Sequence, residues 1–142
     1  MKNSNAFTMI ELIFVIVVLG ILSAIALPKF AGTRVLADIG KGRADVATIR
    51  TAIINERQSR LLLGDNSFIP VLSSAKLFDG NGTSQLLKYG MTDSTTSGNW
   101  HKVDDTTYEY RVGDNSVNTF TYTPADGKFM CTGGVECSKL TD

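Results

Sequence analysis

The chain opens with a long hydrophobic run and then changes to an amphipathic pattern. Residues 7–27, FTMIELIFVIVVLGILSAIAL, include a single charged residue, Glu11. As a helix with a rise of about 1.5 Å per residue, this segment would be roughly 31 Å long, close to the hydrocarbon thickness of a bilayer. The pattern therefore predicts a membrane-spanning helix that carries an acid near its start.

Beyond Pro28 the hydrophobic residues recur at spacings of three, four or seven, which is typical of a helix with one buried face. These residues are Val35, Ile39, Val46, Ile49, Ile53 and Leu61. The turn-forming Gly64-Asp65-Asn66 predicts the end of the helix. Together the two segments predict a nearly continuous helix from Phe7 to about Leu63, with Gly20 and Pro28 as weak points where a kink is expected.

From Phe68 onward the chain is rich in turns and alternates hydrophobic and polar residues. The alternation predicts strands at 107–112, 117–123 and 128–131, which form a three-stranded antiparallel meander on the amphipathic helix. Residues 72–101 are less regular, and we expect loops, a short helix near Ser84–Tyr89 and a Trp100 that anchors this region to the sheet. The predicted fold class is α+β, with a long N-terminal helix packed on a small C-terminal antiparallel sheet.

Composition narrows the classes of function. The 142 residues hold 14 basic and 14 acidic side chains, so no excess of positive charge indicates nucleic-acid binding, although weak DNA contact stays open. The two cysteines, Cys131 and Cys137, suit a disulfide in an oxidising compartment. We therefore expect the head to lie outside the cytoplasm.

Glu11 is the residue that decides between three interpretations of the hydrophobic run. A secretory signal peptide cut after Ala26 fits Lys2 and the small-residue triplet, but Glu11 interrupts its hydrophobic region. An uncleaved single-span anchor explains the run but gives Glu11 no purpose. An ionised carboxylate in a membrane costs up to about 3 kcal/mol, so we expect a partner for it.

The third interpretation comes from Ala6-Phe7-Thr8-Met9-Ile10-Glu11 and the Pro28 that ends the run. This segment resembles the N-terminus of type IV prepilins and type II secretion pseudopilins. In that family a short polar leader is removed, the mature chain begins with an aromatic residue, and a Glu follows four positions later. The family usually has Gly where this chain has Ala6. The resemblance implies that a prepilin peptidase cuts between Ala6 and Phe7 and methylates the new Phe7 amine.

The resemblance also implies a structural role. The residues themselves predict no enzymatic activity and no cofactor, because His101 is the only histidine and no serine lies in a nucleophile motif. The subunit would sit in the bacterial inner membrane with a single span and a periplasmic head. It would then enter a periplasmic or cell-surface filament, as a homopolymer or mixed with related pilins. Implied partners are an assembly platform with an ATPase motor and a secretin. A type IV pilus and a type II secretion pseudopilus both fit.

A free Phe7 amine is mostly cationic and could neutralise Glu11 of a neighbouring subunit in a low-dielectric core. Apolar side chains gain little by leaving lipid for protein, so this pairing would make assembly directional. The segment between Gly20 and Pro28 is either an ordinary kink or, by the resemblance, a part that loosens on assembly.

The predicted organisation is a leader at 1–6, a transmembrane and assembly helix at 7–28, an amphipathic helical half at 29–63 and a β-rich head at 64–142. The basic residues Lys29, Arg34, Lys41 and Arg43 oppose this topology, because positive charge usually flanks the cytoplasmic end of a span. The alternative function is a single-span periplasmic receptor or binding protein with an uncleaved N-terminus.

Other chemistry has weaker sequence support. The cysteine pair either stabilises the last strand or, by the resemblance, forms a C-terminal disulfide loop that varies the surface. The only histidine, His101, is far from the cysteines in sequence, so we expect no zinc site, and a solvated turn explains Asp104-Asp105 better than calcium does. Asp79-Gly80-Asn81-Gly82-Thr83 contains an N-glycosylation sequon at Asn81 and resembles the extended bacterial acceptor.

Overall fold

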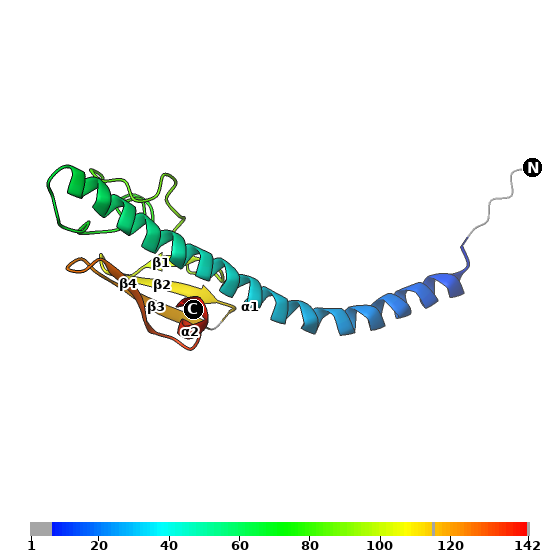
Figure 1. The fold of residues 1–142 in the computed structure, drawn as a ribbon. Coiled ribbons are helices and arrows are strands. Elements are labelled where there is room, and N and C mark those ends of the chain that lie inside the picture. The colour runs from blue at the N-terminus through cyan, green and yellow to red at the C-terminus, as the bar shows by residue number, and fades with distance from the viewer. Residues whose placement is uncertain (1–6, 115, 142) are drawn as a thin grey trace, which may run out of the picture. The chain divides into compact units, whose positions relative to one another are not determined.

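The computed structural model describes residues 7–114 and 116–141. Along the chain it contains α1 (Met9–Leu62), β1 (Trp100–Lys102), β2 (Thr107–Val112), β3 (Ser116–Thr123), β4 (Lys128–Gly133) and α2 (Cys137–Thr141) (Figure 1). The chain divides into two compact units, Met1–Arg34 and Val35–Asp142, and α1 contributes to both. A long N-terminal helix followed by an antiparallel sheet confirms the α+β prediction.

The end of α1 lies where the turn residues predicted it. Gly64 adopts a left-handed φ of 85° and donates its N–H to the carbonyl of Leu61 at 3.0 Å. The N–H of Asp65 reaches back to the carbonyl of Arg60, also at 3.0 Å. This pair of bonds is a Schellman motif, which satisfies carbonyls that the last helical turn leaves without donors.

The buried face of α1 runs through Ile39, Val46, Ile49 and Ile53, as predicted, with Val35 half-buried at its start. The prediction for Leu61 is wrong, because 47% of that residue is exposed. The face that contains Ile49 and Ile53 continues at the same spacing through Glu56 and Arg60, and Leu61 lies about 100° away from it. An ion pair thus occupies the last turn of the face, where a leucine was expected.

The sheet has the order β1-β2-β3-β4 and is antiparallel throughout. In β2 and β3 every second residue is buried, which places Tyr108, Tyr110, Phe120 and Tyr122 against the helix. The alternation and the three predicted strands are confirmed. The meander gains a fourth strand, because Trp100 pairs with Tyr110 at the start of β1.

Polar contacts bind the sheet to the second half of α1. Trp100 donates from Nε1 to Asp45 at 3.1 Å, and the Tyr110 hydroxyl donates to the carbonyl of Asp38 at 2.7 Å. The carboxylate of Asp38 also accepts a bond from the backbone N–H of Gly113 at 3.0 Å. Trp100 is 1% exposed, which confirms that it anchors this region to the sheet.

The segment between α1 and β1 differs from prediction, because the short helix expected near Ser84–Tyr89 is absent from the described chain. The N–H groups of Leu86 and Leu87 bond to the carbonyls of Asp79 and Phe78 instead of to the preceding helical turn. Asp79 organises this loop by accepting bonds from the backbone of residues 74–76. Partial burial alone would raise the pKa of Asp79, but the bonds from these N–H groups outweigh burial and lower the pKa below its usual value.

The helix α2 was not predicted, and it explains why position 42 is a glycine. Leu140 of α2 is fully buried against the sheet-facing side of α1. A Cβ atom built on Gly42 would overlap the ring of Tyr110 and lie 2.6 Å from the Leu140 side chain, whereas one built on Gly40 would meet no atom within 4 Å. Gly42 therefore permits close packing, while Gly40 has no such role.

The two glycines form a matched pair for a stability test. Gly42→Ala should lower the free energy of unfolding by about 1–2 kcal/mol, because overpacking outweighs the gain in helix propensity. Gly40→Ala should raise it by up to about 1 kcal/mol. Urea unfolding of the detergent-solubilised chain, followed by Trp100 fluorescence, measures both. Equal effects of the two variants would contradict the packing role of Gly42.

Buried tyrosines predict a loss of stability at alkaline pH. Burial raises the pKa of Tyr108 and, together with the nearby Glu56, that of Tyr122, each to about 12. Because an unfolded tyrosine ionises near pH 10, the unfolded state releases protons first as the pH rises. The free energy of unfolding should therefore be unaffected by these groups below about pH 10. Above it, stability should fall by up to about 1.4 kcal/mol per pH unit for each tyrosine.

Urea unfolding at a series of alkaline pH values, with tyrosinate absorbance recorded in parallel, tests this expectation. Tyr122→Phe should make the decline less steep, since one ionising group is removed. A native protein whose stability stays constant between about pH 9 and about pH 12 would refute the assignment.

Candidate assembly site

The first turn of α1 is closed by two side chains that bond each other's backbone. Thr8 lies just before the helix, and its N–H and its hydroxyl both donate to Glu11 Oε2 at 2.8 Å. In return the Thr8 oxygen accepts the N–H of Glu11 at 3.3 Å. This Thr-x-x-Glu arrangement is a capping box, which satisfies N–H groups that a helix start leaves free.

Glu11 does have a partner within its own chain, and an uncleaved anchor would therefore still give this acid a structural purpose. The signal was visible in the sequence as Thr8 followed three residues later by Glu11.

One oxygen of the Glu11 carboxylate remains available to accept a further hydrogen bond. Oε2 receives both bonds from Thr8, and no described residue donates to Oε1. Beside the carboxylate lies a hollow of about 470 Å³ lined by Phe7, Ile10, Glu11, Phe14 and Val15. The site thus combines one accepting oxygen with an apolar surface.

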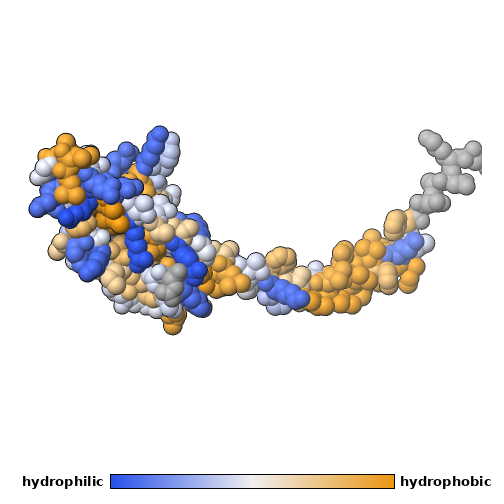
Figure 2. Space-filling model, in the orientation of Figure 1, coloured by the Kyte–Doolittle hydropathy of each residue, from blue (hydrophilic) through white to orange (hydrophobic). Residues whose placement is uncertain are grey.

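The rest of the helical segment before residue 28 is hydrophobic on all sides. Figure 2 shows hydrophobic atoms along most of the visible face of this segment. No residue of its most apolar 18-residue stretch is buried, and the helix is long and apolar enough to cross a bilayer. Phe7 is 79% exposed at its start. Ala6, on the other side of the predicted cleavage point, lies outside the described residues. This segment can serve as a membrane anchor.

Gly20 and Pro28 both lie inside α1, which continues through them. Pro28 has no N–H, so the carbonyl of Ala24 lacks its usual helical donor. A Cβ atom built on Gly20 would meet no other atom within 4 Å, so packing within the chain does not explain this glycine. A functional role for either residue stays a prediction.

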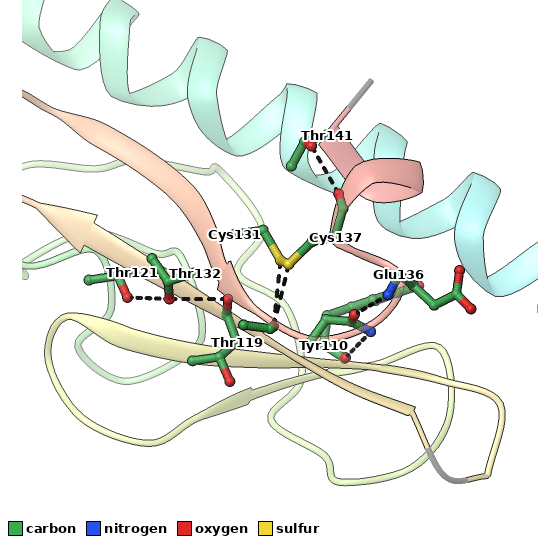
Figure 3. The surroundings of a disulfide bond; sticks show 10 residues. Tyr110, Thr119, Thr121, Cys131, Thr132, Glu136, Cys137 and Thr141 are labelled. Carbon is green, nitrogen blue, oxygen red and sulfur yellow. Dashed lines mark hydrogen bonds between the residues drawn. A yellow bond between two sulfur atoms is a disulfide. The ribbon is translucent and has the colours of Figure 1, made fainter.

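The predicted disulfide is present, and Cys131 of β4 joins Cys137 at the start of α2 with a Cα–Cα distance of 5.6 Å (Figure 3). The loop between them is also held by the buried Asn118, whose Oδ1 accepts the N–H of Glu136 at 2.9 Å. The bridge therefore fixes α2 to the last strand, and α2 in turn buries Leu140. This geometry gives the disulfide a stabilising role in the head.

The head has a groove that sequence reasoning missed. About 740 Å³ in volume, it lies between residues 47–60 of α1, Leu63 just beyond the helix and the segment 84–88, and hydroxyl and amide side chains line much of it. Glu56 at its base is 8% exposed and accepts a bond from Arg60 Nε at 2.6 Å. Hydrogen bonding to Glu56 raises the pKa of Arg60, which keeps the guanidinium charged.

Polar clusters elsewhere have local partners. His101 contacts Asp93 at 2.7 Å, an interaction that lowers the pKa of Asp93. Asp104 accepts the N–H groups of Thr106 and Thr107, both at 2.8 Å, so it closes the turn between β1 and β2. Within the described ranges, no three His, Cys, Asp or Glu side chains gather as metal ligands would.

Comparison with known proteins finds one family motif and two similar proteins. Residues 1–27 match the model of the prokaryotic N-terminal methylation motif. Two fimbrial proteins of Pseudomonas aeruginosa are each 29% identical in an alignment of 105 residues that covers 67% of this chain and 66% of the relative. The chain thus spans just under two thirds of the length of these relatives. No solved structure matches it. The chain carries an N-terminal methylation motif and is similar to fimbrial proteins beyond it, which confirms its resemblance to the type IV pilin family.

Proposed function

We propose that this chain is a structural subunit that polymerises through its N-terminal helix into a type IV filament. The observation that carries the proposal is the Glu11 carboxylate, which has one oxygen used by Thr8 and the other without a described donor, at the start of an exposed apolar helix. The methylation motif supports a subunit of this filament class, and the similarity to fimbrial proteins favours a surface pilus over a secretion pseudopilus. A prepilin peptidase would release Phe7 and methylate its amine.

Energy magnitudes suggest how one carboxylate serves both the monomer and the filament. An ionised acid costs up to about 3 kcal/mol at the centre of a span and less near its end. Hydrogen bonds to a charged group contribute about 1.5–3 kcal/mol each, and a helix N-terminus favours an acid by up to about 1 kcal/mol. The capping box can therefore hold Glu11 in the membrane before assembly.

The incoming Phe7 amine would then supply what the capping box lacks, a positive charge. Its pKa of about 8 in water keeps it mostly protonated at neutral pH. The amine of the incoming subunit would approach Oε1 of Glu11 on the receiving subunit. The incoming Phe7 ring could then enter the hollow that surrounds this Glu11. This contact requires a second subunit at a defined axial offset, and it would set the register of the filament.

The subunit would wait in the bacterial inner membrane with its head in the periplasm, where a disulfide such as Cys131–Cys137 persists. An assembly platform with an ATPase motor would extract it, and a secretin would let a surface filament pass. In this function the protein has no enzymatic activity. The head contributes its outer surface to the filament.

Glu11→Gln separates the charge of this residue from its capping role. Glutamine at this helical position still completes a capping box but cannot pair ionically with an amine. Glu11→Gln should leave the amount of protein in the membrane unchanged and reduce incorporation into filaments about tenfold or more, which corresponds to a loss of about 1.4 kcal/mol or more. Glu11→Ala should lose both contributions. Immunoblots of sheared filaments and of membranes measure the two quantities.

Thr8→Val is the matched control, since it removes the hydroxyl and keeps the carboxylate. It should weaken the cap by about 1 kcal/mol but retain filament assembly. If Glu11→Gln assembled like the native chain while Thr8→Val did not, the acid would act only as a helix cap. The charge-pairing mechanism would then be wrong.

The processed N-terminus is a second expected outcome. Mass spectrometry of protein from its native cells should find a chain that begins at Phe7 and carries one added methyl group. Ala6→Gly, which restores the residue usual in the family, should be processed at least as fast. A mature protein that still begins at Met1 would instead support the membrane-anchored receptor, because no Phe7 amine would be released.

A further inference from the structure

The loop Asp79-Gly80-Asn81-Gly82-Thr83 is not used by the proposed filament contact. It contains the only Asn-X-Ser/Thr sequence in the 142 residues. Such a sequence is an acceptor for N-linked glycans when it lies on the surface of a protein exported from the cytoplasm. The structure shows how the acceptor amide is presented.

The Asn81 side chain uses only its oxygen in the folded loop. Oδ1 accepts bonds from the N–H of Thr83 at 3.2 Å, from the Thr83 hydroxyl at 3.0 Å and from the N–H of Ser84 at 2.7 Å. A carboxamide also has two N–H donors on Nδ2, and no described residue accepts a bond from them. The nitrogen that a glycosyltransferase must reach is therefore not engaged by the rest of the head.

The surroundings of Asn81 leave room for an attached sugar. Gly82 and Thr83 are exposed, and a Cβ atom built on Gly82 would meet no atom within 4 Å. Both sides of the turn are fixed, because Phe78 before it and Leu86 after it are buried and Gly80 pairs with Gln85. The turn is thus supported on both sides, and the half-buried Asn81 is followed by two exposed residues that leave open space beside it for a sugar.

We propose that Asn81 is a site of N-linked glycosylation on the head, a proposal that rests on the periplasmic location given above. The donor would be an oligosaccharide linked through pyrophosphate to a lipid, and an oligosaccharyltransferase would catalyse the transfer. A bond forms between Asn81 Nδ2 and C1 of the first sugar, while the bond between C1 and the pyrophosphate oxygen breaks. The lipid pyrophosphate leaves with the electron pair, and Nδ2 loses one proton to a base on the transferase.

The variants for a test follow from the contacts of each residue. Asn81→Gln removes the acceptor, and Thr83→Val removes the hydroxyl that a sequon requires, whereas Thr83→Ser retains it. Asp79 is a poor choice for substitution, since its carboxylate accepts bonds from Ser74, Ala75 and Lys76 that order the loop. Thr83 is exposed, so its replacement leaves the core intact.

Trypsin digestion followed by mass spectrometry of protein from native cells is the decisive experiment. The peptide Leu77–Lys88 should carry a glycan mass on Asn81 and release sugar fragment ions. This mass should disappear in Asn81→Gln and Thr83→Val but persist in Thr83→Ser. Recovery of Leu77–Lys88 from the native protein only in its unmodified form would overturn the proposal.

The same digest tests the filament proposal independently. A methylated peptide Phe7–Lys29 reports processing by the peptidase, whereas a peptide that begins at Asn3 reports an intact leader. An unmodified Asn81 together with methylated Phe7 would reject glycosylation alone. A glycan on Asn81 together with an intact leader would reject the processed pilin and retain an exported head.

Discussion

A carboxylate at the start of an apolar helix is the constraint on which the N-terminal part of this protein depends. In lipid it must receive hydrogen bonds or a counter-charge, and the described residues supply only the first, through Thr8. The same bonds cap the helix, so a single acid stabilises the monomer and retains one oxygen for another molecule. This division between the two oxygens explains how a subunit could wait in the membrane and still favour one mode of association.

The head depends on a different arrangement, in which one face of α1 packs on an antiparallel sheet. Aromatic residues fill the space between them, and Trp100, Phe78 and Phe129 contact one another at centroid distances of 5.4–5.8 Å. Hydrogen bonds from Trp100 and Tyr110 to α1 fix how the helix is placed on the sheet, since buried donors need specific acceptors. The disulfide then holds α2 in place, and Leu140 completes the core next to Gly42.

Prediction succeeded where a pattern depends on neighbours in sequence. The helix, its end at Gly64 and the alternation of β2 and β3 all follow from local spacing and turn chemistry. It failed where a backbone pairs with distant partners. The leucines at 86 and 87 resemble part of a short helix, but their N–H groups bond to residues 78 and 79. The three residues of β1 are too few to show alternation, and Trp100 is placed by its pairing with Tyr110.

The sequence by itself determined the membrane-length helix, the leader motif, the amphipathic face and the cysteine pair, because each is encoded in the order and spacing of a few residue types. Only the tertiary structure decided the fourth strand, the need for Gly42, the burial of Glu56 under the segment 84–88 and the Asn81 amide nitrogen, which has no acceptor among the described residues. These features arise from contacts between segments far apart in the chain, or from one lone pair being used while a neighbouring atom is not. The spacing of residues along a sequence does not reveal which distant segments pack together or which polar atoms are bonded.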